Sequence, residues 1–233
     1  MHSKLRVVLS GAALLAVVAA FATFVGTGDA SASSAVKLSS NKADDQAASS
    51  EQDSSSLSTH ELKCSSGYYV ASVEAVETTW GLYPSIEQIT LTCRNIDDKT
   101  DTERVSWPDD ILYIEGAGAL ATDYVREQSC ASEGGFVTGM KVDYDYYIKD
   151  YQLRCGDQLI TTKADGSQSV KIDNHGYSGN WVFDRTESDD DQTNLVCNDS
   201  TRVMTGVRVR YKEDSDEIAI TRLQLYCALI QMK

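Results

Sequence analysis

The sequence is poor in several residue types and motifs on which other folds and chemistries depend. It has two prolines and three histidines in 233 residues, and no two cysteines form a C-x-x-C pair. A zinc site made of clustered cysteine and histidine is therefore not indicated. The chain also lacks G-x-S-x-G, H-E-x-x-H, P-loop and G-x-G-x-x-G motifs. We accordingly predict no metal site and no cofactor, and assign no catalytic residue.

Positive charge is scarce as well. Lysine and arginine number 21 against 35 aspartates and glutamates, a formal net charge of −14. Nucleic-acid affinity depends mainly on basic side chains that neutralise phosphates. The composition therefore argues against a nucleic-acid partner and against binding to anionic membranes.

The N-terminus has the three parts of a secretory leader. Basic residues in Met1–Arg6 precede the apolar stretch Val7–Val25, and Ala30-Ser31-Ala32 forms an A-x-A cleavage site. The alternative is a membrane anchor, since nineteen largely apolar residues approach a spanning length. Alanine and glycine interrupt the stretch, however, and no basic cluster follows it. We predict a signal peptide over residues 1–32 and an extracellular protein with no membrane segment after cleavage.

The next segment, residues 33–62, is rich in serine, alanine, aspartate and glutamine and has no aromatic residue other than His60. Such a composition buries too little apolar surface to offset the loss of chain entropy. We predict that residues 33–62 are a disordered spacer and that one domain occupies residues 63–233.

This domain is made of repeats. The segments 70–77, 137–144 and 204–211 align without a gap at an offset of 67 residues, and each leads to a second block that ends in cysteine. Both blocks alternate apolar and polar residues with a period of two, which is typical of half-buried strands. We predict an all-β domain with repeats at about 63–129, 130–196 and 197–233. Three sheets that lean together would bury the aligned positions Val73, Met140, Val207, Leu91, Leu153 and Leu225.

The six cysteines follow the repeats. An even number of cysteines behind a signal peptide indicates disulfides, and each repeat begins with one cysteine and closes its second block with another. Fifteen pairings are open to six cysteines, but equal repeats favour one bridge in each. The predicted bridges are Cys64–Cys93, Cys130–Cys155 and Cys197–Cys227.

The ends of the repeats resemble a known family. The segment 216–227, an acidic pair before an alternating strand closed by Leu-Tyr-Cys, and the segment 64–69, Cys-x-x-Gly before aromatic residues, resemble vitelline membrane outer layer protein I. The alternating strand Val-x-Gly and the presence of three repeats also resemble that family. The resemblance implies a β-prism of three Greek-key sheets with pseudo-three-fold symmetry. A second resemblance, of the tyrosine-rich segment 143–148, is to dermatopontin-like matrix proteins.

Several side chains are candidates for binding or modification. Trp181 and Tyr177 flank a loop-like run, and Tyr146 lies in a run of tyrosines that alternation cannot bury completely. Asp189 and Asp190 could accept hydrogen bonds from sugar hydroxyls, because ligand sites combine apolar surface with a few placed polar groups. Asn198 begins an N-glycosylation sequon.

These features favour a secreted structural or carbohydrate-binding protein of a coat, wall or matrix, with a glycan or a matrix or host protein as partner. One alternative is an enzyme on amino-sugar oligosaccharides, which the vitelline-type resemblance also implies. Glycosidase chemistry needs two carboxylates, and its candidates are Asp109/Asp110, Asp189–Asp191 and Asp214/Asp216/Glu217. Another alternative is a secreted effector or defence protein that binds a host protein.

Overall fold

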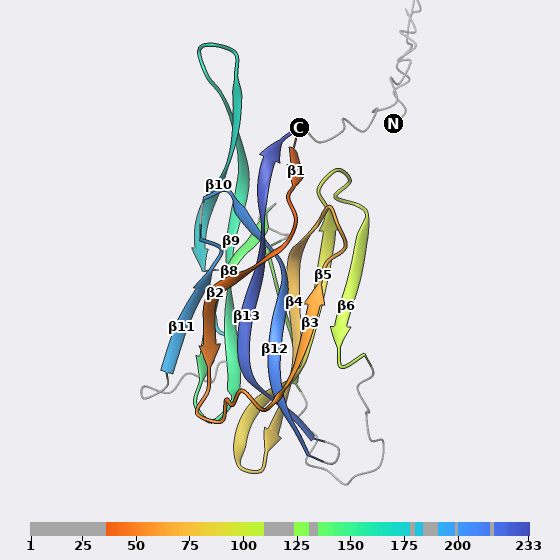
Figure 1. Cartoon of the computed structure of the whole chain (residues 1–233), viewed down its shortest axis with the longest axis vertical. Helices are drawn as coiled ribbons and strands as arrows, with labels where there is room; N and C mark the ends of the chain where they lie inside the picture. The colour runs from red at the N-terminus through yellow and green to blue at the C-terminus, as the bar shows by residue number, and fades with distance from the viewer. Residues whose placement is uncertain are drawn as a thin grey trace, which may run out of the picture. The chain divides into compact units, whose positions relative to one another are not determined.

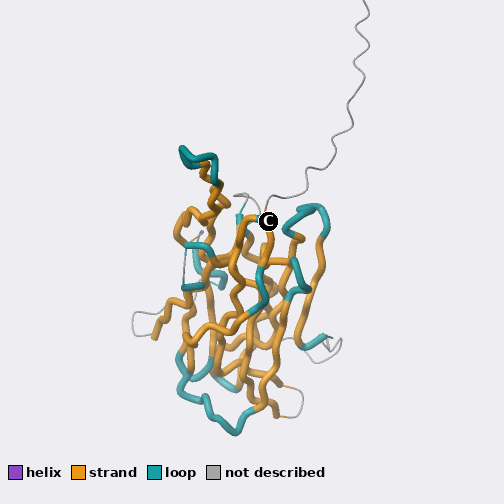
Figure 2. Tube along the Cα trace, turned by 45° about the horizontal axis from the view of Figure 1, so that its top comes forward, coloured by secondary structure: helices purple, strands orange, loops and turns teal. Residues whose placement is uncertain are grey.

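The computed structural model of the chain describes residues 36–109, 124–130, 135–177, 180–183, 191–198, 200–214 and 217–233. The predicted signal peptide, residues 1–32, lies outside them. Regular structure in the described residues is strand alone, as Figure 2 shows, which confirms the all-β prediction. In the same residues, no helix is long and apolar enough to cross a membrane.

The strands form three antiparallel sheets, and Figure 1 labels every strand except β7. Sheet I has the order β6 (Thr102–Trp107), β5 (Tyr83–Asn95), β4 (Tyr68–Trp80), β7 (Tyr124–Ser129). Sheet II has the order β10 (Gln168–Tyr177), β9 (Ile148–Thr162), β8 (Phe136–Tyr144), β11 (Asp191–Val196). Sheet III has the order β1 (Val36–Leu38), β13 (Glu217–Met232), β12 (Arg202–Asp214), β3 (Ser58–Lys63), and β2 (Lys42–Ser49) also pairs with β13.

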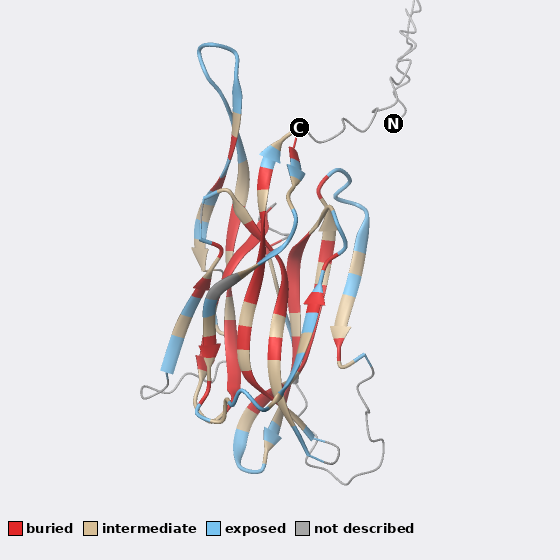
Figure 3. Ribbon diagram, viewed as in Figure 1, coloured by how far each residue is buried: buried red, intermediate tan, exposed pale blue. Residues whose placement is uncertain are grey.

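The three sheets share one register around a common core. The central hairpins pair equivalent residues, namely Val73 with Leu91, Met140 with Leu153 and Val207 with Leu225. All six side chains are 0–1% exposed and belong to one apolar cluster. Figure 3 shows the buried residues running along these central strands. The predicted core is confirmed, and the molecule is a three-sheet β-prism.

A bulge at the same place in each sheet determines how the chain passes from one sheet to the next. The first hairpin strand skips one residue in its pairing, at Ala71, Thr138 and Thr205. The carbonyl oxygens of these residues accept 2.9 Å hydrogen bonds from the amides of Cys130, Cys197 and Cys64, respectively. Because a bulge leaves one residue outside the ladder, its carbonyl is free to hold the opening cysteine of the next repeat.

The disulfides are those predicted, Cys64–Cys93, Cys130–Cys155 and Cys197–Cys227. In space, however, each one joins two sheets. Cys130, for example, follows β7 of sheet I, whereas Cys155 lies in β9 of sheet II. The other two bridges connect sheet II to sheet III and sheet III to sheet I. The three bridges therefore link the prism in a ring.

The prediction of a disordered spacer over 33–62 is wrong for residues 36–62, which contain β1, β2 and most of β3. The third repeat supplies only the hairpin β12–β13, and both edges of this hairpin need partners. Strand β3 pairs with β12, and β1 and β2 pair with β13. The segment has few apolar side chains, and three of them, Val36, Ala48 and Leu62, are fully buried. Figure 1 shows these orange strands beside the blue C-terminal ones.

Candidate ligand-binding surfaces

Two of the predicted binding residues lie on the outer side of sheet II. The hydroxyl of Tyr177, at the end of β10, donates a 2.8 Å hydrogen bond to Oδ1 of Asn194 on β11. The Lys141 Nζ lies 5.0 Å from the centre of the Trp181 ring. Lys141 and Asn194 are direct register partners, so the structure brings Trp181 and Tyr177 to one face. Both rings already have partners there.

The segment that carries Trp181 is held by a side chain from another sheet. The amide of Val182 donates to the carbonyl oxygen of Tyr151 at 3.1 Å. The Gln128 side chain, on β7 of sheet I, donates to the Asn180 carbonyl and accepts from the Leu153 amide at 2.8 Å. Sequence reasoning missed Gln128. Its signal was available in the sequence, because Leu62, Gln128 and Leu195 each stand two residues before the opening cysteine of a repeat.

The acidic candidates are only partly covered by the structure. Asp189 and Asp190 lie outside the described residues, as do Asp110 and Asp216. Asn198 is exposed, and its glycosylation stays a prediction. A carboxylate pair that the sequence did not suggest is Asp143 and Asp150, which face each other in register on β8 and β9. Both are 0% exposed, so neither carboxyl group is accessible to a substrate in this structure.

The third predicted aromatic residue, Tyr146, belongs to a different place. It lies between β8 and β9, and its ring centre is 4.1 Å from that of Tyr83, the first residue of β5. Nearby, the rings of Trp80 and Tyr147 are 5.9 Å apart. Leu82, between Trp80 and Tyr83, is 93% exposed, and Tyr83 is 41% exposed. We call the five residues Trp80, Leu82, Tyr83, Tyr146 and Tyr147 the aromatic end of the prism.

Charged groups from sheet III and from the segment after β2 surround the aromatic end. The amide of Glu51 donates to the Asp145 carbonyl at 3.0 Å, which places Glu51 next to the β8–β9 turn. The hydrogen bond with Tyr83 raises the pKa of the Tyr146 phenol, and the negative charges of Glu51 and Asp145 raise it further. The pKa of Tyr147 is raised by burial and by the charges of Tyr83 and Glu217.

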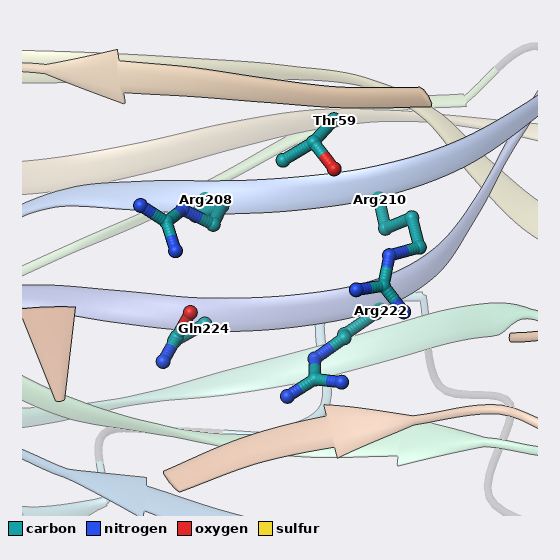
Figure 4. Close-up of a pocket in the computed structure, with 5 residues that line it drawn as sticks. All are labelled: Thr59, Arg208, Arg210, Arg222 and Gln224. Atoms are coloured by element: carbon teal, nitrogen blue, oxygen red, sulfur yellow. The ribbon is translucent and has the colours of Figure 1, made fainter. Parts of the chain in front are cut away.

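A basic hollow lies on the outer face of sheet III. It has a volume of about 270 Å³ and is lined by Thr59, Arg208, Arg210, Arg222 and Gln224, drawn in Figure 4. Together with Glu61, these residues form two rows across the strands, Thr59–Arg210–Arg222 and Glu61–Arg208–Gln224. We call this site the arginine hollow. Sequence reasoning missed it, because Thr59 and Glu61 come from the segment predicted to be disordered.

Two carboxylates pair with the arginines of the hollow. Asp53 accepts from Arg210 Nη1 at 3.0 Å, and its other oxygen lies 3.6 Å from Arg222 Nη1. Glu61 accepts from Arg208 Nε at 2.9 Å and from Lys63 Nζ at 2.6 Å. The hydrogen bonds of Glu61 with Lys63, Tyr226 and Arg208 lower the pKa of its carboxyl group to about 2.

Comparison with known proteins gives similarity at the level of structure only. No family model matches the chain, and no curated protein is similar to it. A prostate-specific WGA16 glycoprotein lectin is 10% identical, with a TM-score of 0.41 over 77% of this chain and 97% of that one.

Two further solved structures are similar over a part of their own length. PirB is 11% identical, with a TM-score of 0.41 over 83% of this chain and 38% of that one. The mosquito-larvicidal Cry4Aa toxin from Bacillus thuringiensis is 8% identical, with a TM-score of 0.43 over 83% of this chain and 33% of that one. This chain thus spans well under half of those two proteins. Similarities of this size do not establish a shared function.

Proposed function

We propose that the protein is a secreted carbohydrate-binding protein of an extracellular coat, wall or matrix, and that the aromatic end holds the glycan. One observation carries the proposal. Two hairpin turns from different sheets meet at a Tyr83–Tyr146 ring contact of 4.1 Å, beside a Leu82 that is 93% exposed. Large apolar side chains gathered on the surface generally mark an interaction site.

The polar groups around these rings suit a neutral sugar. Aromatic faces can stack on the C–H faces of a sugar ring, and neighbouring carboxylates can accept hydrogen bonds from its hydroxyl groups. Glu51, Asp145 and Glu217 act electrostatically on Tyr146 and Tyr147. The same carboxylates repel anionic membrane surfaces and nucleic acids, which weighs against an apolar anchor for an anionic lipid bilayer.

Other features agree with an extracellular role. Three disulfides are typical of proteins that fold in an oxidising compartment. The resemblance of the repeat ends to vitelline membrane outer layer protein I supports a coat or matrix protein. The outer face with Trp181 and Tyr177 is the weaker candidate, because Asn194 already accepts from the Tyr177 hydroxyl. A lysine lies beside a tryptophan at both places, Lys141 at Trp181 and Lys212 at Trp80.

A glycan array tests the proposal. We expect the purified protein to bind a neutral glycan, and the double variant Tyr83→Ala/Tyr146→Ala to bind it at least about tenfold more weakly, equal to about 1.4 kcal/mol. The matched control is Tyr177→Ala/Trp181→Ala, which also removes two partly exposed rings and should bind as the wild type does. Unchanged binding by the first variant, or binding to no glycan at all, would contradict the proposal. A protein partner captured through the aromatic end would point to the effector alternative instead.

A further inference from the structure

We propose that the arginine hollow of sheet III binds the acid group of an anionic saccharide. The hollow lies on the outer face of sheet III, on different strand segments from the aromatic end, and it has the opposite charge character. The inference goes beyond the proposed function and does not depend on it.

Like charges face each other across two strands of the hollow. Arg210 and Arg222 are direct register partners on neighbouring antiparallel strands, and like charges in this position normally destabilise a sheet. A single carboxylate, Asp53, lies within 4 Å of both guanidinium groups. An arrangement that gathers arginines on one face of a chain with a net charge of −14 suggests a role in binding an anion.

The charges of the ion pairs at the hollow do not balance. Four basic side chains (Arg208, Arg210, Arg222 and Lys63) meet two carboxylates (Asp53 and Glu61) in the ion pairs of the hollow. Among the described side chains of these ion pairs, two positive charges are therefore in excess. The side chains of Arg208 and Arg222 are 40% and 34% exposed, so both can be reached from solvent.

Two arginines of the hollow have unused hydrogen-bonding capacity. The buried Nε of Arg210 has no hydrogen-bond partner in the described part of the chain. Arg222 lies 3.6 Å from its carboxylate partner, which is longer than an ordinary hydrogen bond. A guanidinium group carries five donors in a planar fork that matches the oxygens of a carboxylate, sulfate or phosphate group.

The equivalent place on the other two sheets does not gather arginines. The residues 67 and 134 positions before Arg208 are Lys141 and Glu74, respectively. On sheet I, Glu74 pairs with Arg104 at 2.7 Å. On sheet II, Lys141 lies over Trp181. The hollow is thus a property of sheet III rather than a consequence of the repeat.

The size of the hollow indicates the class of ligand. A volume of about 270 Å³ is several times the roughly 30 Å³ that a water molecule occupies. It is close to the lower end of the range for small-ligand sites, about 300–1,000 Å³. One sugar residue that carries an acid group suits this space, with the acid group at Arg222 and Arg208 and a hydroxyl group at Thr59 or Gln224.

Calorimetric titration with three hexasaccharides of equal length tests the inference. One probe is sulfated, one carries uronate carboxylates only, and one is neutral. We expect at least one acidic probe to bind more tightly than the neutral one, and inorganic sulfate at constant ionic strength to compete with it. The sulfated and uronate probes separate the two sources of the acid group.

Arginine variants locate the site. Arg222→Gln leaves the Asp53–Arg210 pair in place and should lower the affinity for the acidic probe at least about tenfold. Arg104→Gln on sheet I removes the same charge from a more exposed side chain (62%) and should leave binding unchanged. The double variant Tyr83→Ala/Tyr146→Ala should also bind the acidic probe as the wild type does. Equal weakening by Arg104→Gln and Arg222→Gln, or no preference for an acidic probe, would overturn the inference.

Discussion

The hydroxyl group of Tyr151, on β9 of sheet II, donates a 2.7 Å hydrogen bond to the main-chain carbonyl oxygen of Val73, on β4 of sheet I. Tyr151 is 1% exposed. Burial raises the pKa of its phenol well above the ordinary value, and repulsion by Asp150 adds to this. The group therefore stays protonated and acts as a donor. In the equivalent positions sheets I and III have Ile89 and Leu223, so one polar contact joins two sheets inside an apolar core.

Removing this hydroxyl should destabilise the prism. Tyr151→Phe leaves the ring in place but takes away the buried donor, and an unsatisfied buried acceptor costs about 1–3 kcal/mol. Urea unfolding measures the change. Tyr177→Phe is the control, since its hydroxyl bonds to the exposed Asn194, and it should cost less than about 0.5 kcal/mol. Equal effects of the two variants would show that the Tyr151–Val73 bond is not important for stability.

The N-terminal strands should behave as part of the core. Leu62 and Leu195 occupy equivalent register positions, opposite Val207 and Met140, and both are fully buried. Replacing either one by alanine should lower the free energy of unfolding by about 2–5 kcal/mol. Thermal or urea unfolding of the two variants checks this. If Leu62→Ala were neutral while Leu195→Ala were costly, β3 would not complete sheet III.

Each disulfide should contribute a similar amount to the free energy of unfolding. Their sequence separations are 29, 25 and 30 residues, and loops of this length correspond to about 3–4 kcal/mol each in the chain-entropy model. Peptide mapping without reduction should recover Cys64–Cys93, Cys130–Cys155 and Cys197–Cys227. Double Cys→Ala variants should each lower stability in urea, and a mapped bridge between any other two cysteines would disagree with the ring of sheets.

The Glu61 cluster predicts a pH dependence. Its carboxyl pKa in the folded protein is about 2, below the ordinary value of 4.5. A lowered pKa stabilises the fold above pH 4.5, and this contribution is lost as the pH falls from 4.5 toward 2. The stability difference between wild type and Glu61→Gln should therefore be largest near neutral pH and vanish in acid. It should stay below about 1 kcal/mol, because the group is partly exposed. A stability difference that grows as the pH falls would contradict the predicted direction of the pH dependence.

The sequence predicted the repeated parts of the fold well. The period-two pattern and the offset of 67 residues located the central hairpins, the six core residues and the three disulfides. It failed for residues 36–62, because these outer strands bury few side chains and satisfy their backbone groups by pairing with strands β12 and β13, which are far away in the sequence. Here Leu62 is the only buried side chain of β3. The low apolar content of such strands resembles that of a disordered segment, and long-range pairing does not show in composition.

The candidate sites were less predictable for the same reason. Tyr146 could be singled out as an exposed ring, but its contact with Tyr83 spans two hairpin turns of different sheets. The arginine hollow needs Asp53 and Thr59 beside Arg210 and Arg222, and more than 150 residues of chain separate these pairs. Gln128 could have been recognised from the repeat alignment alone, as a polar residue at a position that is otherwise leucine.

Chemical-shift mapping by NMR tests carbohydrate binding at the aromatic end most directly. The purified protein is titrated with the neutral glycan that the array selects, and backbone amide signals are followed through saturation. The account predicts that the shifts cluster at Trp80, Leu82, Tyr83, Tyr146 and Tyr147, with little change near Trp181 and Tyr177. Shifts centred on Trp181 and Tyr177, or spread evenly over the three sheets, would contradict it.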